Sequence, residues 1–350
     1  MEFSKKTPKS LGYRMPAEWE AQEAIWLSWP HNKETWHGVL SEVEGTYAEF
    51  VKALHAGQKV KILVKDEEMR INASVKLKKA GIDFSQVIFY KAGTIDAWIR
   101  DYGPTFVFNQ NSKKKLAFVK WTFNAWGDKY NELKQDNSIP YEINRGMNLP
   151  FFEPGIILEG GSIDVNGSGT VLTTKQCLLN KNRNPKLSKA DIEEFLKSYL
   201  NAKNILWLKE GIAGDDTDGH IDDIARFVNK STVVCAFEED KEDENYQILK
   251  DNYELLCSMK DESGNKLKVI KLPMPGFAGS GKKRLPASYA NFYIGNSAVA
   301  VPVFGHKNDK KAIEILKALF PGRKIVGINC TAMVHGLGAL HCISQQEPKV

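Results

Sequence analysis

The chain has 350 residues, a formal net charge of +5 and an ordinary share of hydrophobic (42%) and charged (26%) residues, which excludes a disordered protein. Its lysines are scattered among acidic stretches such as Glu238-Glu-Asp240, so a nucleic-acid-binding stripe is not expected. No apolar run approaches the roughly 20 residues of a membrane span, and Met1-Glu-Phe-Ser-Lys-Lys6 lacks the apolar segment of a secretory signal.

The predicted elements begin with a helix over Glu42–Leu54 and a strand over Val60–Val64. Hairpins with short turns rich in Asn, Gly and Ser are typical of two paired strands, and we expect them at 104–119, 162–173, 220–237 and 290–303. After the last three hairpins we expect helices at 188–199, 242–259 and 310–319, and then strands at 205–208, 268–272 and 324–328. Ser188-Lys-Ala-Asp191 has the pattern of a capping box, which indicates where the first of these helices begins.

The order strand, strand, helix, strand therefore recurs, with about 60–70 residues between successive hairpins. Such units cannot each bury an apolar face alone, so they are expected to pack around a common centre within one domain over residues 1–350. If the units form a closed ring, the C-terminal strand at Leu340–Ile343 should pair near Ala24–Ser28. An ordinary mixed α/β protein with several hairpins is the alternative.

Polar residues stand at the start of similar hairpins and at the last strand. The segments are Trp98-Ile-Arg-Asp-Tyr-Gly103, Leu158-Glu-Gly-Gly-Ser162, Gly219-His-Ile-Asp-Asp223 and Gly338-Ala-Leu-His-Cys342. Carboxylates, a histidine and a cysteine at separate strand ends indicate one site assembled from distant parts of the chain. Their chemistry favours nucleophilic catalysis on a cationic substrate.

Cys342 is the candidate nucleophile among five cysteines that are widely spaced and contain no Cys-x-x-Cys pair. This arrangement argues against a disulfide framework and a structural zinc site, and it favours a reducing cytoplasm. Cys342 follows Gly336-Leu-Gly338, whose glycines let the backbone approach a ligand, and it stands beside His341. A thiolate near a histidine or another cation is a strong nucleophile. The alternative is a small buried hydrophobe, which we expect for the other four cysteines.

The carboxylates are suited to holding a cation. His220 and Asp222 alternate on an expected strand, so their side chains should share one face. Asp101 and Glu159 are either structural ion-pair partners or members of the same pocket, where carboxylates would repel one another without a cation between them. A guanidinium donates paired hydrogen bonds to carboxylates, and Trp98 offers it an aromatic face.

Two competing motifs do not fit. The acidic run 214–223 lacks the offsets of a calcium loop and has too few His or Cys neighbours for a catalytic metal, so we expect no metal. The segment 276–283 lacks the Ser or Thr that a phosphate-binding loop places after its lysine, and Pro286 follows where a helix should run. We expect a flexible loop near the site entrance there.

Motifs along nearly the whole chain resemble the agmatine deiminase and bacterial-type peptidyl-arginine deiminase family, within the guanidino-group-modifying superfamily. Besides Trp98–Phe106, Leu158–Ile163 and Gly214–Asp222, the matching stretches are Met15-Pro-Ala-Glu-Trp-Glu20, Asn180-Lys-Asn-Arg-Asn-Pro185, Leu285-Pro-Ala-Ser-Tyr-Ala-Asn-Phe-Tyr-Ile294 and Leu340-His-Cys-Ile-Ser-Gln-Gln346. The resemblance implies a five-bladed α/β propeller (a pentein) of pseudo-symmetric ββαβ repeats around a central active site.

The resemblance also implies roles for individual residues. Cys342 would be the nucleophile and His220 the general acid and base, without a cofactor or metal. Asp101 and Asp222 would hold the guanidinium, and Glu159 would support the substrate and His220.

Four further residues are expected near the substrate, namely Trp98, Asp216, Gly336 and Gly338. Two of these stretches depart from the agmatine-specific pattern. Gly336-Leu-Gly-Ala-Leu-His-Cys342 stands in place of Gly-Gly-Gly-Asn-Ile-His-Cys, and Asp216 stands where agmatine enzymes often have glutamate.

The expected activity is therefore cytoplasmic, cysteine-dependent hydrolysis of agmatine to N-carbamoylputrescine and ammonia, a reaction on the route to putrescine. The expected partner is a small cationic guanidino substrate, with no nucleic acid and no membrane, and a homo-oligomer is left open. A deiminase of free or peptidyl arginine is the nearest alternative. A metal-dependent hydrolase and a noncatalytic binder of cations are rivals from other classes.

Overall fold

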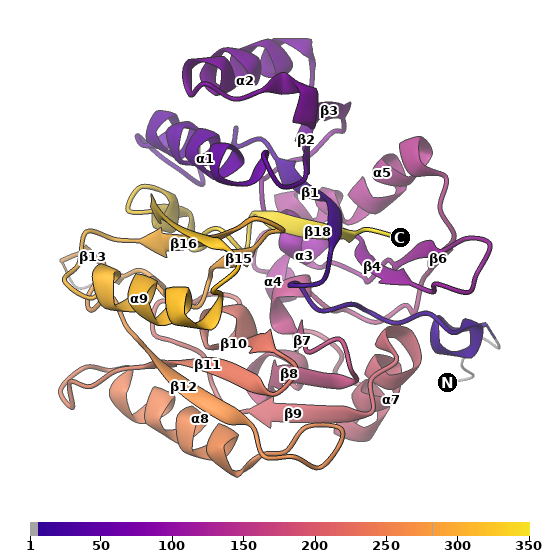
Figure 1. Cartoon of the computed structure of the whole chain (residues 1–350), viewed down its shortest axis with the longest axis vertical. Helices are drawn as coiled ribbons and strands as arrows, with labels where there is room; N and C mark the ends of the chain where they lie inside the picture. Colours follow the sequence, from indigo (N-terminus) through magenta and orange to yellow (C-terminus); the bar gives the residue numbers. More distant parts are fainter. Residues whose placement is uncertain (1–5, 282) are drawn as a thin grey trace.

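The computed structural model describes residues 6–281 and 283–350 (Figure 1). In these residues the strands form five sheets of three or four strands and a small two-stranded sheet. The protein is thus a mixed α/β fold of several small sheets.

One sheet combines the two ends of the chain. Its strand order is β18-β1-β2-β3, with β18 antiparallel to β1 and the others parallel. The bounds are β1 Gln22–Ser28, β2 Lys59–Val64, β3 Val87–Lys91 and β18 Ser344–Pro348. Helices α1 (Leu40–Leu54) and α2 (Glu67–Lys79) connect its parallel strands.

The other four large sheets share one pattern, an antiparallel pair followed by a strand parallel to the second one. Their strands are β4 Thr105–Phe108, β5 Leu116–Val119, β6 Phe151–Phe152, β7 Asp164–Val165, β8 Thr170–Thr174, β9 Asn204–Leu208, β10 Ala225–Asn229, β11 Thr232–Phe237, β12 Lys268–Pro273, β15 Tyr293–Ile294, β16 Ala298–Val303 and β17 Lys324–Asn329. The helices that precede each third strand are α5 Ile139–Met147, α7 Lys189–Leu200, α8 Tyr246–Ser258 and α9 Asp309–Leu319.

Short helical turns occupy the connections. They are α3 Ile99–Tyr102, α4 Ala125–Asp128, α6 Lys175–Leu178, η1 Lys9–Leu11, η2 Phe84–Gln86, η3 Asn131–Ser138, η4 Gly160–Ser162, η5 Ile221–Asp223 and η6 Met333–Gly336. The small sheet pairs β13 (Gly279–Ser280) with β14 (Lys283–Arg284).

The predicted hairpins and helices are confirmed, including the capping box in which Ser188 and Asp191 open α7. The first hairpin is also followed by a helix and a strand, α5 and β6, which the sequence did not reveal. Strand β6 has two residues, too few for an alternating pattern.

The C-terminal strand pairs with β1 as predicted, but its bounds were wrong. It begins at Ser344 rather than Leu340, and Ile25 faces Gln346 in the ladder. Residues 340–343 form a turn instead, so Cys342 lies just before the strand.

The prediction that His220 and Asp222 lie on a strand was also wrong. His220 is the residue before η5, Asp222 lies within this 3-10 turn, and β10 begins at Ala225. The residues before the other hairpins behave alike, with Asp101 inside α3 and Glu159 directly before η4. The polar residues therefore stand on tight turns, whose side chains point in directions that strand alternation does not predict.

Neighbouring sheets share hydrophobic clusters, and Figure 1 shows the five sheets around the middle of the view. Successive residues of a strand point to opposite faces, so a middle strand can pack against two neighbours. The pairs that divide between two clusters in this way are Phe118 and Val119 in β5, Val171 and Leu172 in β8, Val233 and Val234 in β11, and Ala300 and Val301 in β16.

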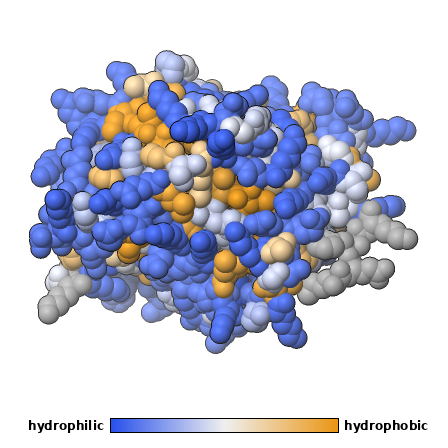
Figure 2. All heavy atoms as spheres, turned by 90° about the horizontal axis from the view of Figure 1, so that it is seen from below, coloured by the Kyte–Doolittle hydropathy of each residue, from blue (hydrophilic) through white to orange (hydrophobic). Residues whose placement is uncertain are grey.

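The face shown in Figure 2 is mainly hydrophilic, with smaller hydrophobic areas among the charged side chains. Across residues 6–281 and 283–350, every helix is too short or too polar to reach through a bilayer. Apolar areas of this kind are ordinary on folded proteins.

Candidate active site

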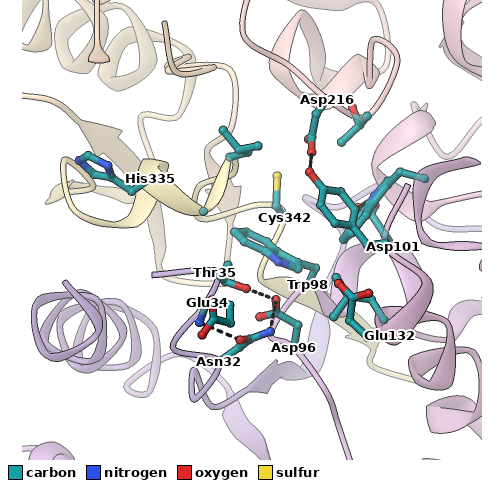
Figure 3. A pocket seen from close by; sticks show the side chains of 16 residues that line it. Asn32, Glu34, Thr35, Asp96, Trp98, Asp101, Glu132, Asp216, His335 and Cys342 are labelled. Carbon is teal, nitrogen blue, oxygen red and sulfur yellow. Dashed lines mark hydrogen bonds between the residues drawn. The ribbon is translucent and has the colours of Figure 1, made fainter. Parts of the chain in front are cut away.

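A cavity of about 260 Å³ lies beside Cys342 (Figure 3). Its lining consists of carboxylates, aromatic rings, one histidine (His335), two leucines and small or polar side chains, without a lysine or arginine among the described residues. The carboxylates are Glu34, Asp96, Asp101, Glu132 and Asp216, and the aromatic residues are Trp98, Trp126 and Tyr130. Its charge therefore suits a small cation.

Cys342 is 9% exposed and lines the cavity. Its Sγ accepts a hydrogen bond from Asn291 Nδ2 at 3.0 Å and lies 3.8 Å from Asp222 Oδ2. Burial and the nearby carboxylates, Asp222 foremost, raise the pKa of the Cys342 thiol well above its ordinary value. A bound cation would counteract these carboxylates and favour the thiolate.

His341 holds the Asp222 side chain in place, with His341 Nδ1 2.7 Å from Asp222 Oδ2. The other ring nitrogen of His341, Nε2, lies 2.9 Å from Glu18 Oε2. Glu18 also accepts from Arg226 and Arg100, and although burial opposes ionisation, these cations and His341 lower its pKa. Burial opposes the ionisation of Asp222, but this buried chain of charges, His341 foremost, lowers the pKa of Asp222.

Asp101 accepts hydrogen bonds from the Trp126 indole at 2.9 Å and from the Gly161 backbone N–H at 2.9 Å. Its Oδ1 lies 3.6 Å from Nδ1 of the buried His220. Burial raises the pKa of Asp101 to about 6, partly opposed by His220. Burial alone would lower the pKa of His220, but Asp101 and other negative groups raise it well above its ordinary value.

Glu159 lies behind His220 rather than in the cavity wall. It is fully buried, and its Oε1 accepts from Arg183 Nε at 2.6 Å. Ligand-type atoms of Glu159, Cys177 and His220 lie within 4.8 Å of one another. The geometry thus allows Glu159 to orient His220. Glu159 does not line the cavity, so its predicted support of the substrate is not matched by a contact there.

Two buried atoms near Cys342 have no hydrogen-bond partner among the described residues, His220 Nε2 and Asp222 Oδ1. Buried polar atoms are nearly always paired, so Asp222 Oδ1 is available to a ligand, whereas the His220 ring also lies beside the Cys177 thiol. His220 is the residue expected to act as general acid and base, and Asp222 is expected to bind the guanidinium.

Trp98 forms one wall and packs against Trp36, with ring centroids 5.3 Å apart. The two predicted glycines leave room for this wall. A Cβ on Gly336 would come within 2.5 Å of Trp36, and one on Gly338 within 2.6 Å of Trp98. Gly336 lines the cavity, whereas Gly338 acts behind it by accommodating the tryptophan.

Asp216 also lies in the cavity wall, where the Tyr130 hydroxyl donates to its carboxylate at 2.5 Å (Figure 3). Burial raises the pKa of Asp216. The predicted residues Cys342, Asp101, Trp98, Asp216 and Gly336 thus share one cavity.

Four functional candidates were not singled out from the sequence: Glu18, Trp126, Asn291 and His341. Glu18 and Asn291 lie in quoted family-like motifs, and His341 precedes the candidate nucleophile, so those motifs contained the signal. Trp126 lies in no such motif, and nothing in the local pattern marked it.

Two expectations outside the cavity need correction. Cys257 is exposed, not part of the core, because it follows the buried Leu256 on α8 and faces away. Around 276–284, where a flexible loop was expected, the chain forms the short hairpin β13–β14, and Lys282 lies outside the described residues. Ala278 packs in the same cluster as Leu337, a cavity residue.

Among residues 6–281 and 283–350, side chains that could hold a metal occur in two buried groups, Glu159–Cys177–His220 and Asp222–Asp223–Cys342. Arg183 bonds to Glu159 in the first group, which disfavours another cation there. The second group contains the candidate nucleophile and a guanidinium ligand.

The chain matches the Porphyromonas-type peptidyl-arginine deiminase family over residues 14–348. The agmatine deiminase of Medicago truncatula is 36% identical over 375 residues, covering 98% of each chain. The solved agmatine deiminase of Enterococcus faecalis superposes with a TM-score of 0.91 at 36% identity, covering 100% of each chain. A solved cysteine-to-serine variant of the C. jejuni agmatine deiminase with substrate bound has a TM-score of 0.86 and 36% identity over 96% of each chain. This protein therefore belongs to the Porphyromonas-type peptidyl-arginine deiminase family.

Proposed function

We propose that this protein hydrolyses agmatine to N-carbamoylputrescine and ammonia through a covalent adduct on Cys342. The observation that carries the proposal is a cavity that holds a cysteine and five carboxylates with no lysine or arginine among its described lining residues. The agmatine deiminases of Enterococcus faecalis and Medicago truncatula support the choice of substrate. The substrate-bound cysteine-to-serine variant from C. jejuni supports a cysteine-dependent reaction.

The guanidinium end of the substrate is expected beside Cys342. Asp101 and Asp222 would accept its N–H groups, and the unpaired Oδ1 of Asp222 is available for this. The flat face of Trp98 would cover the cation. These contacts hold the guanidinium carbon in line with Sγ and supply the positive charge that favours the thiolate.

The amine end distinguishes agmatine from arginine. Agmatine has an ammonium there, which suits Glu132 and Asp216 in the cavity wall. Free arginine adds a carboxylate, for which the described lining offers no lysine or arginine and only His335 as a basic side chain. Arginine within a peptide lacks this charge, so it remains the alternative that the experiment must test.

In the first half of the reaction, the Cys342 thiolate attacks the guanidinium carbon and forms an S–C bond. His220, protonated through its raised pKa, gives a proton to one NH2 group of the tetrahedral adduct. The C–N bond then breaks, ammonia leaves, and a thiouronium remains on Cys342 with His220 neutral.

In the second half, neutral His220 takes a proton from a water molecule whose oxygen attacks the thiouronium carbon. The S–C bond breaks and its electron pair returns to Cys342 as the thiolate. The ureido product, still carrying one proton more than the neutral urea, loses that proton to solution, where the ammonia released earlier takes it up as ammonium. Covalent catalysis divides a difficult hydrolysis into two easier displacements.

Three broader features belong to the same proposal. The five sheets with their shared clusters would form a five-bladed propeller around the site, within one domain. The reaction would take place in the cytoplasm, where reducing conditions keep Cys342 as a thiol. Its product would supply the formation of putrescine.

The decisive experiment measures ureido product from agmatine, free arginine and an arginyl peptide in parallel, with Cys342→Ala as the control. We expect turnover of agmatine, at least about 100-fold slower turnover of arginine because its carboxylate is left unpaired in an acidic cavity, and none in the variant. Preference for arginine or the peptide would contradict the substrate. Full activity of Cys342→Ala would contradict the thiolate mechanism.

A further inference from the structure

Asn291, two residues before β15, lies directly against the sulfur of Cys342. Its side chain is fully buried, and Nδ2 donates to Cys342 Sγ at 3.0 Å and to Asp223 Oδ1 at 2.9 Å. On the other side, Oδ1 accepts the backbone N–H of His341 at 2.9 Å and that of Cys342 at 3.4 Å. Every polar atom of the amide is therefore engaged.

The orientation of this amide follows from its partners. Backbone N–H groups can only donate, so they require Oδ1 to face residues 341 and 342. Asp223 can receive a hydrogen bond from Nδ2 on the opposite side. The two constraints agree, and they leave an N–H directed at Sγ.

The sulfur needs such a donor because its surroundings oppose ionisation. Asp222, Asp223 and Asp101 all lie close enough to disfavour a negative sulfur. A hydrogen bond to a charged acceptor is stronger than one to a neutral acceptor, so the Asn291 N–H binds the thiolate more tightly than the thiol.

We propose that Asn291 is a catalytic residue that stabilises the Cys342 thiolate through its side-chain N–H. The proposal extends the function above, because it takes Cys342 as the nucleophile. It assigns the same N–H to each stage at which the sulfur is negative, before the attack and again when the S–C bond breaks. The backbone bonds to Oδ1 hold the donor in place.

A structural role for Asn291 is the competing explanation, since the amide also connects the 340–343 turn to the segment before β15. The two explanations differ in one observable. Loss of a structural bond lowers stability, whereas loss of a donor to the thiolate also changes how readily the sulfur ionises.

The test compares Asn291→Asp and Asn291→Ala with the parent protein. Asn291→Asp keeps the size of the side chain and an oxygen for the two backbone N–H groups, but it removes the donor. The matched control is Ser288→Ala, which loses the buried hydrogen bond from Ser288 Oγ to the Asp223 carbonyl (2.7 Å) in the same segment. Ser288 has no hydrogen bond to the sulfur.

The readout is the rate at which iodoacetamide alkylates Cys342 as a function of pH, followed by mass spectrometry of its peptide. Exposed Cys257 serves as the internal reference. Below the midpoint the rate is proportional to the thiolate fraction, so the ratio of rates reports the shift even when the midpoint is high. This measurement requires no substrate.

We expect both Asn291 variants to move the alkylation profile upward by about one pH unit, which is about tenfold less thiolate at a given pH. The control should lose stability without this shift, and kcat for agmatine should fall with the thiolate. An unchanged profile in folded Asn291→Asp would overturn the role of Asn291, whether or not agmatine is the substrate. If the shift occurs while the parent does not turn over agmatine, the proposed function fails and the role of Asn291 stands.

Discussion

At the scale of single residues, the site combines groups whose charges oppose one another until a cation arrives. Cys342 has a raised pKa because it is buried and carboxylates lie near it, and Asp101 has a raised pKa because it is buried. A bound guanidinium lowers both pKa values, since it attracts the thiolate of Cys342 and the carboxylate of Asp101. The charges of the site therefore favour reaction of Cys342 with a cationic substrate over reaction with other electrophiles.

The raised pKa of Asp101, about 6, predicts the acid side of the pH profile. Asp101 must be ionised to hold the guanidinium, so the fall of kcat/KM for agmatine with decreasing pH, which already follows the Cys342 thiolate, should become steeper below about pH 6. Trp126→Phe removes the indole N–H that lowers this pKa, and the acid limb should move upward by about half a unit to one unit. The pH dependence of kcat/KM measures the shift.

Trp121→Phe is the control for that experiment. It also removes a buried indole N–H, which donates to Thr105 Oγ1 at a distance of 3.1 Å. This hydrogen bond lies outside the cavity. An equal shift in this variant, or none in Trp126→Phe, would contradict the assignment to Asp101.

The raised pKa of Asp101 also affects stability. The native state binds this proton more tightly than the unfolded state, so the contribution of Asp101 to the free energy of unfolding decreases as the pH rises from 3.8 to about 6.

At the scale of elements, the turn that carries Trp126 is left-handed. Four consecutive residues, Ala125 to Asp128, have positive φ angles of 54°, 54°, 86° and 65°. Such a conformation costs about 1–2 kcal/mol for each residue other than glycine. Long-range contacts hold it, including the bond from the Trp126 indole to Asp101.

Gly127→Ala should therefore be damaging. A Cβ at this position, where φ is 86°, would come within 2.3 Å of the Asn182 side chain, which is hydrogen-bonded to Asp218. We expect the free energy of unfolding to fall by at least about 2 kcal/mol and KM for agmatine to rise as Trp126 is displaced. Denaturant unfolding and steady-state kinetics measure the two effects.

The control is Gly45→Ala in the interior of α1, where a Cβ meets no atom within 4 Å. This change should raise the free energy of unfolding by about 0.5–1 kcal/mol, because alanine favours the helix. If Gly127→Ala behaved like Gly45→Ala, the left-handed turn would not be required for the site.

At the scale of the whole molecule, β18 joins the chain ends and also supports the site. Glu347 forms a buried ion pair with Lys61 at 2.7 Å, and it accepts from the Trp26 indole at 2.7 Å. Gln345 and Gln346 accept from Arg100, the neighbour of Asp101.

Deletion of residues 344–350 should abolish activity although every residue predicted for the site is kept. Lys61 would lose its buried partner, which alone costs about 3–5 kcal/mol, and β1 would lose its ladder on one side. Thermal unfolding and agmatine turnover measure the result. Deletion of residues 349–350 removes chain beyond β18, so it should change little, and near-normal stability in the longer deletion would contradict this role.

The sequence by itself determined the repeated units, the hairpins, the capping box of α7 and the candidate nucleophile. These follow from local physics, namely the alternation of strands, the chemistry of turns and the reactivity of a thiol beside glycines and a histidine. The strand expected at His220 and Asp222 was wrong, because a tight turn takes its place.

The tertiary structure alone decided which side chains meet. Asn291 is hydrogen-bonded to Cys342. Glu18 contacts His341, although more than a hundred residues separate the two in the chain. The left-handed turn under Trp126 contradicts local preference and persists because distant contacts stabilise it. Local patterns record how a segment folds, whereas the partner of a buried polar group depends on the packing of segments that are remote in the chain.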